Sequence, residues 1–255
     1  MKTMRSVVIA AAVLALATLG TAATRNTGGT SDPGASLGQH VLTPPAAMAG
    51  ETILYAPSEG DDAALRNAIA AITGGTVDYF DARAATPDVA LLQSYDCVYT
   101  WANYAYLDST GFGNNLAGAV DAGTVVILGT FCTYTSGNSL GGQIMTSAYS
   151  PVWSPTASNH FISSNYSGDG TTPIHNGVTT YECMFRDILT LQGAGLQDGS
   201  YQDGEIAHAY RPDFKVIYSN GSGATQLGCT GQWAQLVANA CQVGVPVELQ
   251  SISIE

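Results

Sequence analysis

Residues 116–134 read LAGAVDAGTVVILGTFCTY, and they contain a helix end, a glycine turn and a strand in direct succession. Gly123 closes a helical pattern that begins near residue 109, and the four residues at 125–128 are all apolar. A strand that is apolar on both faces is typical of a parallel sheet covered by helices on both sides. We therefore predict a buried parallel strand at 124–131, with Cys132 on the turn that follows it.

The segments before this strand alternate between strand and helix patterns. We predict further strands at 52–58, 76–82 and 95–104, and helices at 59–75, 86–94 and 109–123. Asp61 or Asp62 can cap the first helix, and Thr86 opens the second, with Pro87 in its first turn. This order predicts an α/β fold, a three-layer, doubly wound and mainly parallel sheet.

The second half is less regular. Residues 135–175 are rich in Ser, Gly, Asn, Thr and Tyr, and we expect long loops there. Two strand patterns at 205–210 and 215–220 flank the turn RPDF and predict a β-hairpin. An amphipathic helix at 232–244 closes the fold. We divide the chain into a signal peptide (1–23), a flexible linker (24–50), an α/β domain (51–243) and a strand-like tail (244–255).

The first residues have the order of a secretory signal peptide. Lys2 and Arg5 precede an apolar run at 6–19, and small residues follow at 20–23. The run of about 14 residues is shorter than the ~20 that span a bilayer. We expect cleavage after Ala22 or Ala23, and a secreted or cell-surface protein, extracellular or periplasmic, with no membrane span after cleavage.

The charge balance bears on possible partners. The full chain has a formal net charge of −12, and removal of Lys2 and Arg5 leaves 6 basic against 20 acidic residues, a net charge of −14. Such a surface repels nucleic acid and anionic lipid. We expect no nucleic-acid partner.

Five cysteines follow the signal peptide, and none form a CxxC pair or have a histidine at metal-ligand spacing. We therefore expect no metal site and no cofactor. An oxidising compartment allows one or two disulfides, and the odd count leaves at least one cysteine outside them within a single chain. Cys229 and Cys241 are the favoured bridge members and Cys183 is a third candidate, whereas Cys97 is expected to be a core residue.

Four strings resemble class I glutamine amidotransferase-like domains and the related ThuA-like proteins, which share a flavodoxin-like fold. Residues 53–82 resemble their opening strand–helix–strand unit, and 91–106 resemble their third strand. Residues 116–131 resemble the helix, turn and strand that carry the family's nucleophile elbow. Residues 171–178, TTPIHNGV, resemble a downstream ThuA-like string. The resemblance covers 51–243 and implies fold more than activity.

The elbow departs from the catalytic pattern of that family, which is G-x-C-x-G. Here Phe131 stands at the cysteine position, Cys132 comes one residue later, and no second glycine follows. The family's late H-x-E motif is also missing. His175 lies in the ThuA-like string, whereas His208 lies within the predicted hairpin, with Glu205 as a possible surface partner. Cys132 and His175 are the candidate catalytic residues.

A ligand crevice is expected where the parallel strands end, because open α/β sheets bind ligands beyond their carboxyl ends. Aromatic rings beside amides and carboxylates suit a carbohydrate or another polar small molecule. The alternative for Trp101 and Tyr104 is ordinary packing under a loop. The candidate ligand-binding residues are Ser58, Glu59, Asp61, Trp101, Asn103, Tyr104, Thr130, Phe131 and Tyr134.

Three functions remain open from the sequence. The first is an exported, non-catalytic amidotransferase-like domain that binds a ligand or partner at the cell surface. The second is a hydrolase or amidase that uses Cys132 with His160 or His175. The third is an extracellular structural or assembly protein with a self-assembly partner, suggested by the flexible leader and strand-like tail.

Overall fold

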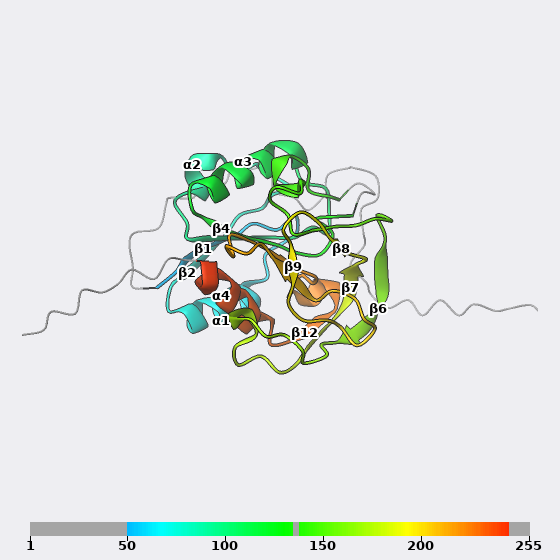
Figure 1. The fold of residues 1–255 in the computed structure, drawn as a ribbon. Helices are drawn as coiled ribbons and strands as arrows, with labels where there is room; N and C mark the ends of the chain where they lie inside the picture. The colour runs from blue at the N-terminus through cyan, green and yellow to red at the C-terminus, as the bar shows by residue number, and fades with distance from the viewer. Residues whose placement is uncertain (1–49, 135–137, 245–255) are drawn as a thin grey trace, which may run out of the picture.

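The computed structural model describes residues 50–134 and 138–244, so the predicted signal peptide, most of the linker and nearly all of the tail lie outside it. Its centre is a seven-stranded sheet in the order β2-β1-β3-β4-β11-β10-β9 (Figure 1). The first five strands in this order are parallel to one another, and β10 and β9 are antiparallel to their neighbours. The strands are β1 (Thr52–Tyr55), β2 (Thr76–Tyr79), β3 (Cys97–Thr100), β4 (Val125–Leu128), β9 (Leu196–Gln197), β10 (His208–Tyr210) and β11 (Val216–Ser219).

Helices cover both faces of this sheet. Helices α2 and α3 lie on one face, and α1 and α4 lie on the other (Figure 1). All residues of β1, β3 and β4 are buried, as strands between two helical layers require. The predicted three-layer α/β fold is therefore confirmed. The helices are α1 (Ala63–Thr73), α2 (Val89–Leu92), α3 (Ser109–Asp121) and α4 (Trp233–Gly244).

The caps explain where the first two helices begin. The Asp62 carboxylate accepts the Leu65 N–H, and Gly74 ends α1 in the left-handed conformation at φ 71°. Helix α2 begins later than we predicted, because Asp88 rather than Thr86 is its cap and accepts the Leu91 N–H. Pro87 therefore precedes the cap instead of occupying the first turn.

The region expected to be long loops is the main correction. It contributes β6 (Asn159–Asn165) to a three-stranded antiparallel sheet with β7 (Tyr181–Asp187) and β12 (Cys229–Gly231). Strand β6 is mostly exposed and polar, so it lacks the apolar run that would identify it. Smaller elements complete the second half of the chain: β5 (Val152–Trp153), β8 (Thr190–Leu191), η1 (Gln143–Met145), η2 (Pro173–His175) and η3 (Thr225–Leu227).

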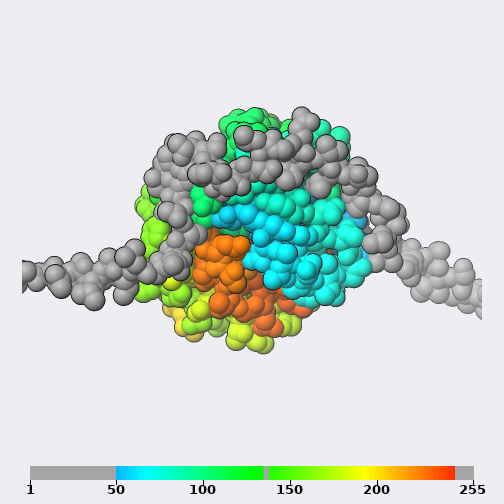
Figure 2. All heavy atoms as spheres, turned by 180° about the vertical axis from the view of Figure 1, so that it is seen from behind, coloured from blue at the N-terminus to red at the C-terminus, as the bar shows by residue number. Residues whose placement is uncertain are grey.

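The predicted hairpin and closing helix are both present. Strands β10 and β11 pair antiparallel, with His208 opposite Ser219, and the turn between them contains Phe214 at φ 56°. Helix α4 packs beside α1, so the first and last helices of the described chain share one face, cyan beside orange-red in Figure 2.

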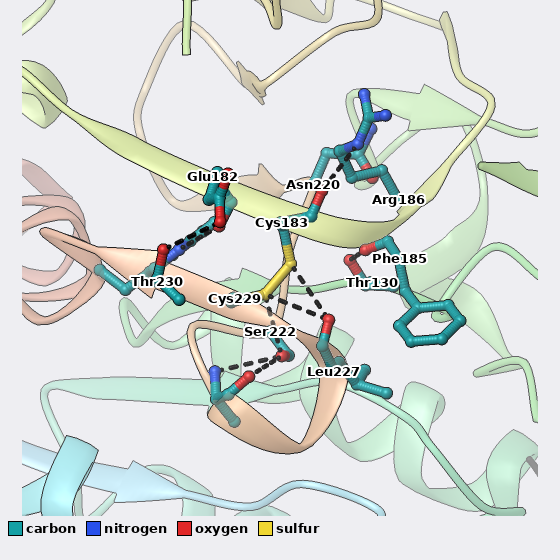
Figure 3. Close-up of a disulfide and its surroundings, with 12 residues drawn as sticks. Thr130, Glu182, Cys183, Phe185, Arg186, Asn220, Ser222, Leu227, Cys229 and Thr230 are labelled. Carbon is teal, nitrogen blue, oxygen red and sulfur yellow. Dashed lines mark hydrogen bonds between the residues drawn. A yellow bond between two sulfur atoms is a disulfide. The ribbon is translucent and has the colours of Figure 1, made fainter. Parts of the chain in front are cut away.

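Two disulfides join segments that are distant in sequence. Cys97 of β3 is bonded to Cys241 of α4, and Cys183 of β7 is bonded to Cys229 of β12 (Figure 3). All three favoured bridge members are therefore bridged. Cys97 is a core residue, as expected, but it is also a bridge partner. Cys132 is the free cysteine.

Candidate functional site

The turn after β4 has the backbone of an elbow but not its nucleophile. Phe131 adopts φ 68°, in the left-handed region that an aromatic residue rarely occupies. Such strain costs of order 1–3 kcal/mol and persists only where surrounding contacts hold it. The Phe131 ring is fully buried, with ring centroids 5.9 Å from Phe185 and 5.7 Å from Tyr134. The position that carries the nucleophile in the resembled family is thus occupied by a packed aromatic ring.

Asp187, at the end of β7, holds this elbow in place. Its carboxylate accepts the Phe131 N–H at 2.9 Å and the Thr133 hydroxyl at 2.8 Å. The hydroxyl of Tyr218 and the side-chain amide of Asn159 donate to it as well. Burial raises the pKa of Asp187 to about 6, although these hydrogen bonds act in the opposite direction. A second contact, from the Thr130 hydroxyl to the Phe185 carbonyl, joins the elbow to β7 (Figure 3).

Cys132 points into the interior. Its sulfur lies 3.6 Å from the Tyr106 hydroxyl and 3.8 Å from the Thr100 carbonyl oxygen, and the residue is fully buried. Burial raises the pKa of the Cys132 thiol to about 12, so the thiol is protonated at neutral pH. Within residues 50–134 and 138–244, no histidine hydrogen-bonds to this thiol. The geometry therefore gives no support to the cysteine-hydrolase alternative.

The histidines have other partners. His160 Nε2 lies 3.0 Å from the Glu205 carboxylate, so the expected pairing of Glu205 with His208 is wrong. His208 is buried, and burial holds its pKa well below the usual range. His175 contacts Asp198 at 2.8 Å through Nδ1 rather than Cys132.

A continuous hydrogen-bonded chain joins these buried groups, and the sequence did not indicate it. The Tyr181 hydroxyl lies 3.1 Å from His175 Nε2 and 3.2 Å from His208 Nδ1, and His208 Nε2 lies 2.9 Å from the Ser219 hydroxyl. Burial opposes ionisation of Asp198, yet hydrogen bonds from His175 and Thr172 hold its pKa well below the usual range. Asp198 lies at one end of this chain and the Ser219 hydroxyl at the other.

The residues predicted to line a ligand crevice are mostly engaged with one another. Glu59 accepts the Asn103 amide at 2.6 Å and lies 3.5 Å from Arg83. The Ser58 hydroxyl donates to the Tyr104 carbonyl at 2.6 Å. These contacts join the segments that follow β1 and β3.

The remaining predicted ligand residues behave similarly. Trp101 is fully buried and donates its indole N–H to the Tyr55 hydroxyl at 3.0 Å, which confirms the packing alternative for this residue. Asp61 forms an ion pair with Arg66 at 2.6 Å on the surface. Several of the predicted ligand residues thus contact other side chains of the protein, although Asn103 Oδ1 is buried and has no hydrogen-bond partner among the described residues.

An open cavity lies beside the elbow. It has a volume of about 210 Å³. Two larger hollows lie at Lys215, near the amino ends of the parallel strands, and at Trp233. Ser154, one of the residues that line the cavity beside the elbow, has a buried side-chain oxygen with no hydrogen-bond partner among the described residues. Its lining residues are Cys132, Thr133, Ser139, Leu140, Met145, Val152, Trp153 and Ser154.

The raised pKa of Asp187 makes a prediction about stability and pH. A carboxyl group with a raised pKa contributes stability that is present below its ordinary pKa of 3.8 and lost as pH rises through about 6. We expect the difference in unfolding free energy between the wild type and Asp187→Asn to shift in favour of the wild type by about 2 kcal/mol as pH falls from 7.5 to 4.5. Urea denaturation of both proteins measures it.

His208 acts in the opposite direction, because a depressed histidine pKa makes acid destabilising below its ordinary pKa of 6.5. Since His208 is present in both proteins, its contribution cancels in the comparison. A difference that stays constant across this pH range would show that Asp187 does not titrate as described.

Comparisons with known proteins identify the fold. No family model matches the sequence, and no curated protein matches it. Among solved structures, a cytoplasmic protein of Salmonella typhimurium LT2 aligns with 76% of this chain and 100% of its own, at a TM-score of 0.53 and 12% identity. A Thermoplasma acidophilum protein described as a GMP synthase subunit aligns with 78% of this chain and 96% of its own, at a TM-score of 0.51 and 10% identity.

A ThuA-like protein of Bacteroides uniformis also aligns, over 81% of this chain and 95% of its own, at a TM-score of 0.50 and 9% identity. Identities this low carry fold and not function. The chain thus has the fold of amidotransferase-like and ThuA-like proteins, and the resemblance seen in the sequence is confirmed at that level.

Proposed function

We propose that this protein is an exported, non-catalytic amidotransferase-like domain that binds a ligand at the cell surface. The observation that carries the proposal is Phe131, a buried ring at the elbow position where the resembled family has its nucleophile. The Phe131 N–H is bound by Asp187, and the neighbouring thiol is buried with a pKa raised to about 12. The elbow is kept as a structural feature.

Export is supported by two independent features. The leader has the charged, apolar and small-residue order of a signal peptide. Four of the five cysteines are paired in disulfides, which form and persist mainly in oxidising compartments. The acidic net charge fits a protein that stays soluble outside the cell.

Binding is supported by the cavity at the carboxyl end of β4. It lies beside the elbow, at the end of the sheet where α/β folds commonly hold ligands. Trp153 forms part of its wall and is 46% exposed, so one aromatic side chain is accessible to a ligand. The crevice was expected beyond the carboxyl ends of β1, β3 and β4, and this cavity lies at the end of β4.

Native-state alkylation of the secreted protein tests the non-catalytic assignment. We expect Cys132 to stay unlabelled by iodoacetamide from pH 5 to 9 until the protein is denatured, because the thiol is buried and protonated. The other four cysteines should label only after reduction. Mass spectrometry of the peptides reads each site, and the mature N-terminus should begin after Ala22 or Ala23.

The variant Ser163→Cys provides the matched control, because Ser163 is exposed on β6 and its thiol should label at the rate of a free cysteine. Rapid labelling of Cys132 near neutral pH in the native protein would reverse the assignment and favour an enzyme. Retention of the leader in a cytoplasmic protein would contradict export.

A further inference from the structure

The cavity beside the elbow has a consistent chemical character. None of its lining residues carries a charge, and the larger ones are apolar: Leu140, Met145, Val152 and Trp153. Because no lining side chain offers an ion-pair partner, a charged ligand would lose its hydration without compensation. The net charge of the protein opposes anions further. The cavity therefore selects for an uncharged ligand.

The walls of the cavity are held by contacts outside it. Val152 and Trp153 of β5 pair with Leu191 and Thr190 of β8. The Gln192 side-chain amide donates to the Val152 carbonyl at 2.8 Å and to the Met145 carbonyl at 3.2 Å. The backbone of the cavity walls is thus held in place, which reduces the ordering that a ligand must impose on binding.

The floor of the cavity is held as well, because the hydroxyl of Thr133 donates to Asp187. This hydroxyl can therefore accept a hydrogen bond but has no proton left to donate elsewhere. The Cys132 thiol lies against Tyr106 and Thr100. Most of the polar atoms at the floor already have partners.

Ser154 is the exception. Within the part of the chain that the structure describes, its hydroxyl oxygen is buried and has no hydrogen-bond partner. A buried polar group left unpaired is costly, and ligands or ordered water commonly satisfy such groups. A ligand with one hydrogen-bonding group at the right place would satisfy this hydroxyl and leave the apolar walls to the rest of the molecule.

We propose that the cavity binds a small, uncharged aromatic molecule of one ring with a single hydroxyl or amine substituent. The Ser154 side chain turns its hydroxyl toward the polar group and pairs with it, and the ring packs against Trp153. The volume of about 210 Å³ fits this size, since an apolar cavity of ~150 Å³ binds benzene. A sugar carries hydroxyls around its whole ring and fits this lining less well. The inference rests on the binding role proposed above.

Calorimetric titration of the mature protein with four probes tests the ligand class. We expect p-cresol to bind one to one with a Kd of about 1 mM or tighter, and benzoate and glucose to bind at least about tenfold more weakly. Toluene should bind more weakly than p-cresol, because it cannot pair with Ser154. Tighter binding of glucose than of p-cresol would overturn the ligand class and leave the binding role intact.

Two variants locate the site. We expect Ser154→Ala to weaken p-cresol binding about tenfold and toluene binding less than about twofold, because only p-cresol uses the hydroxyl. Trp153→Ala should weaken both. Ile72→Ala is the control, since Ile72 is 40% exposed on α1, on the other face of the sheet. Circular dichroism spectra confirm that the variants are folded.

The outcomes separate this inference from the proposed function. If p-cresol binds equally well to the wild type, Ser154→Ala and Trp153→Ala, or binds to none of them, the inference is overturned. In both cases a protected Cys132 in the alkylation experiment would leave the non-catalytic assignment standing. A labelled Cys132 would contradict that assignment whether or not p-cresol binds.

Discussion

Asp187→Ala is expected to lower the free energy of unfolding by about 4 kcal/mol at neutral pH. The carboxylate accepts hydrogen bonds from the Phe131 N–H, the Thr133 hydroxyl, Tyr218 and Asn159, and all of these groups are buried. Truncation leaves several buried donors unpaired at once. It also removes the contact that holds Phe131 in the left-handed conformation. Urea denaturation followed by circular dichroism measures the loss.

Asp213→Ala is the matched control. Asp213 is also an aspartate with a side-chain partner, here Arg211, but its side chain is 46% exposed, and such surface pairs contribute about 1 kcal/mol or less. We expect this variant to differ little from the wild type. Equal losses for the two variants would contradict the view that Asp187 joins the elbow to the second sheet.

Removal of the Cys97–Cys241 disulfide is the second large effect. The bond closes a loop with a sequence separation of 144 residues between β3 and α4. Because a long loop gains much conformational entropy when it is opened in the unfolded state, we expect Cys97→Ala with Cys241→Ala to lower the unfolding free energy by about 3–5 kcal/mol. Thermal and urea denaturation of the double variant test this.

The second disulfide gives an internal comparison. Cys183 and Cys229 are separated by 46 residues, so the loop-entropy difference predicts that their removal costs about 1 kcal/mol less. Both pairs are fully or almost fully buried, so the loss of packing is similar in the two variants. A larger loss on removing Cys183 and Cys229 would show that local packing, rather than loop length, sets the contribution of these bonds.

The predictions from the sequence differ from the structure mainly at residues whose partners lie far away in the chain. Glu59 and Asn103 follow strand ends, as predicted, but their side chains bind each other. Glu59 also lies within ion-pair distance of Arg83. Neither Asp187 nor Tyr181 stood out in the sequence. Each lies in β7, and each acts on segments tens of residues away. Strand β6 was missed because its exposed, polar residues carry no apolar period.

Local patterns in the chain were enough to predict the alternation of strands and helices over residues 51–134, the hairpin and the closing helix. Those features follow from periodicity, caps and turn residues, which act within a few positions of one another. The resemblance to the amidotransferase-like family placed Phe131 and not Cys132 at the elbow position. The disulfide pairs, the carboxylate at the elbow and the cavity at Trp153 became visible only in the folded chain. They depend on which distant segments folding brings together, and a local pattern does not specify its distant partner.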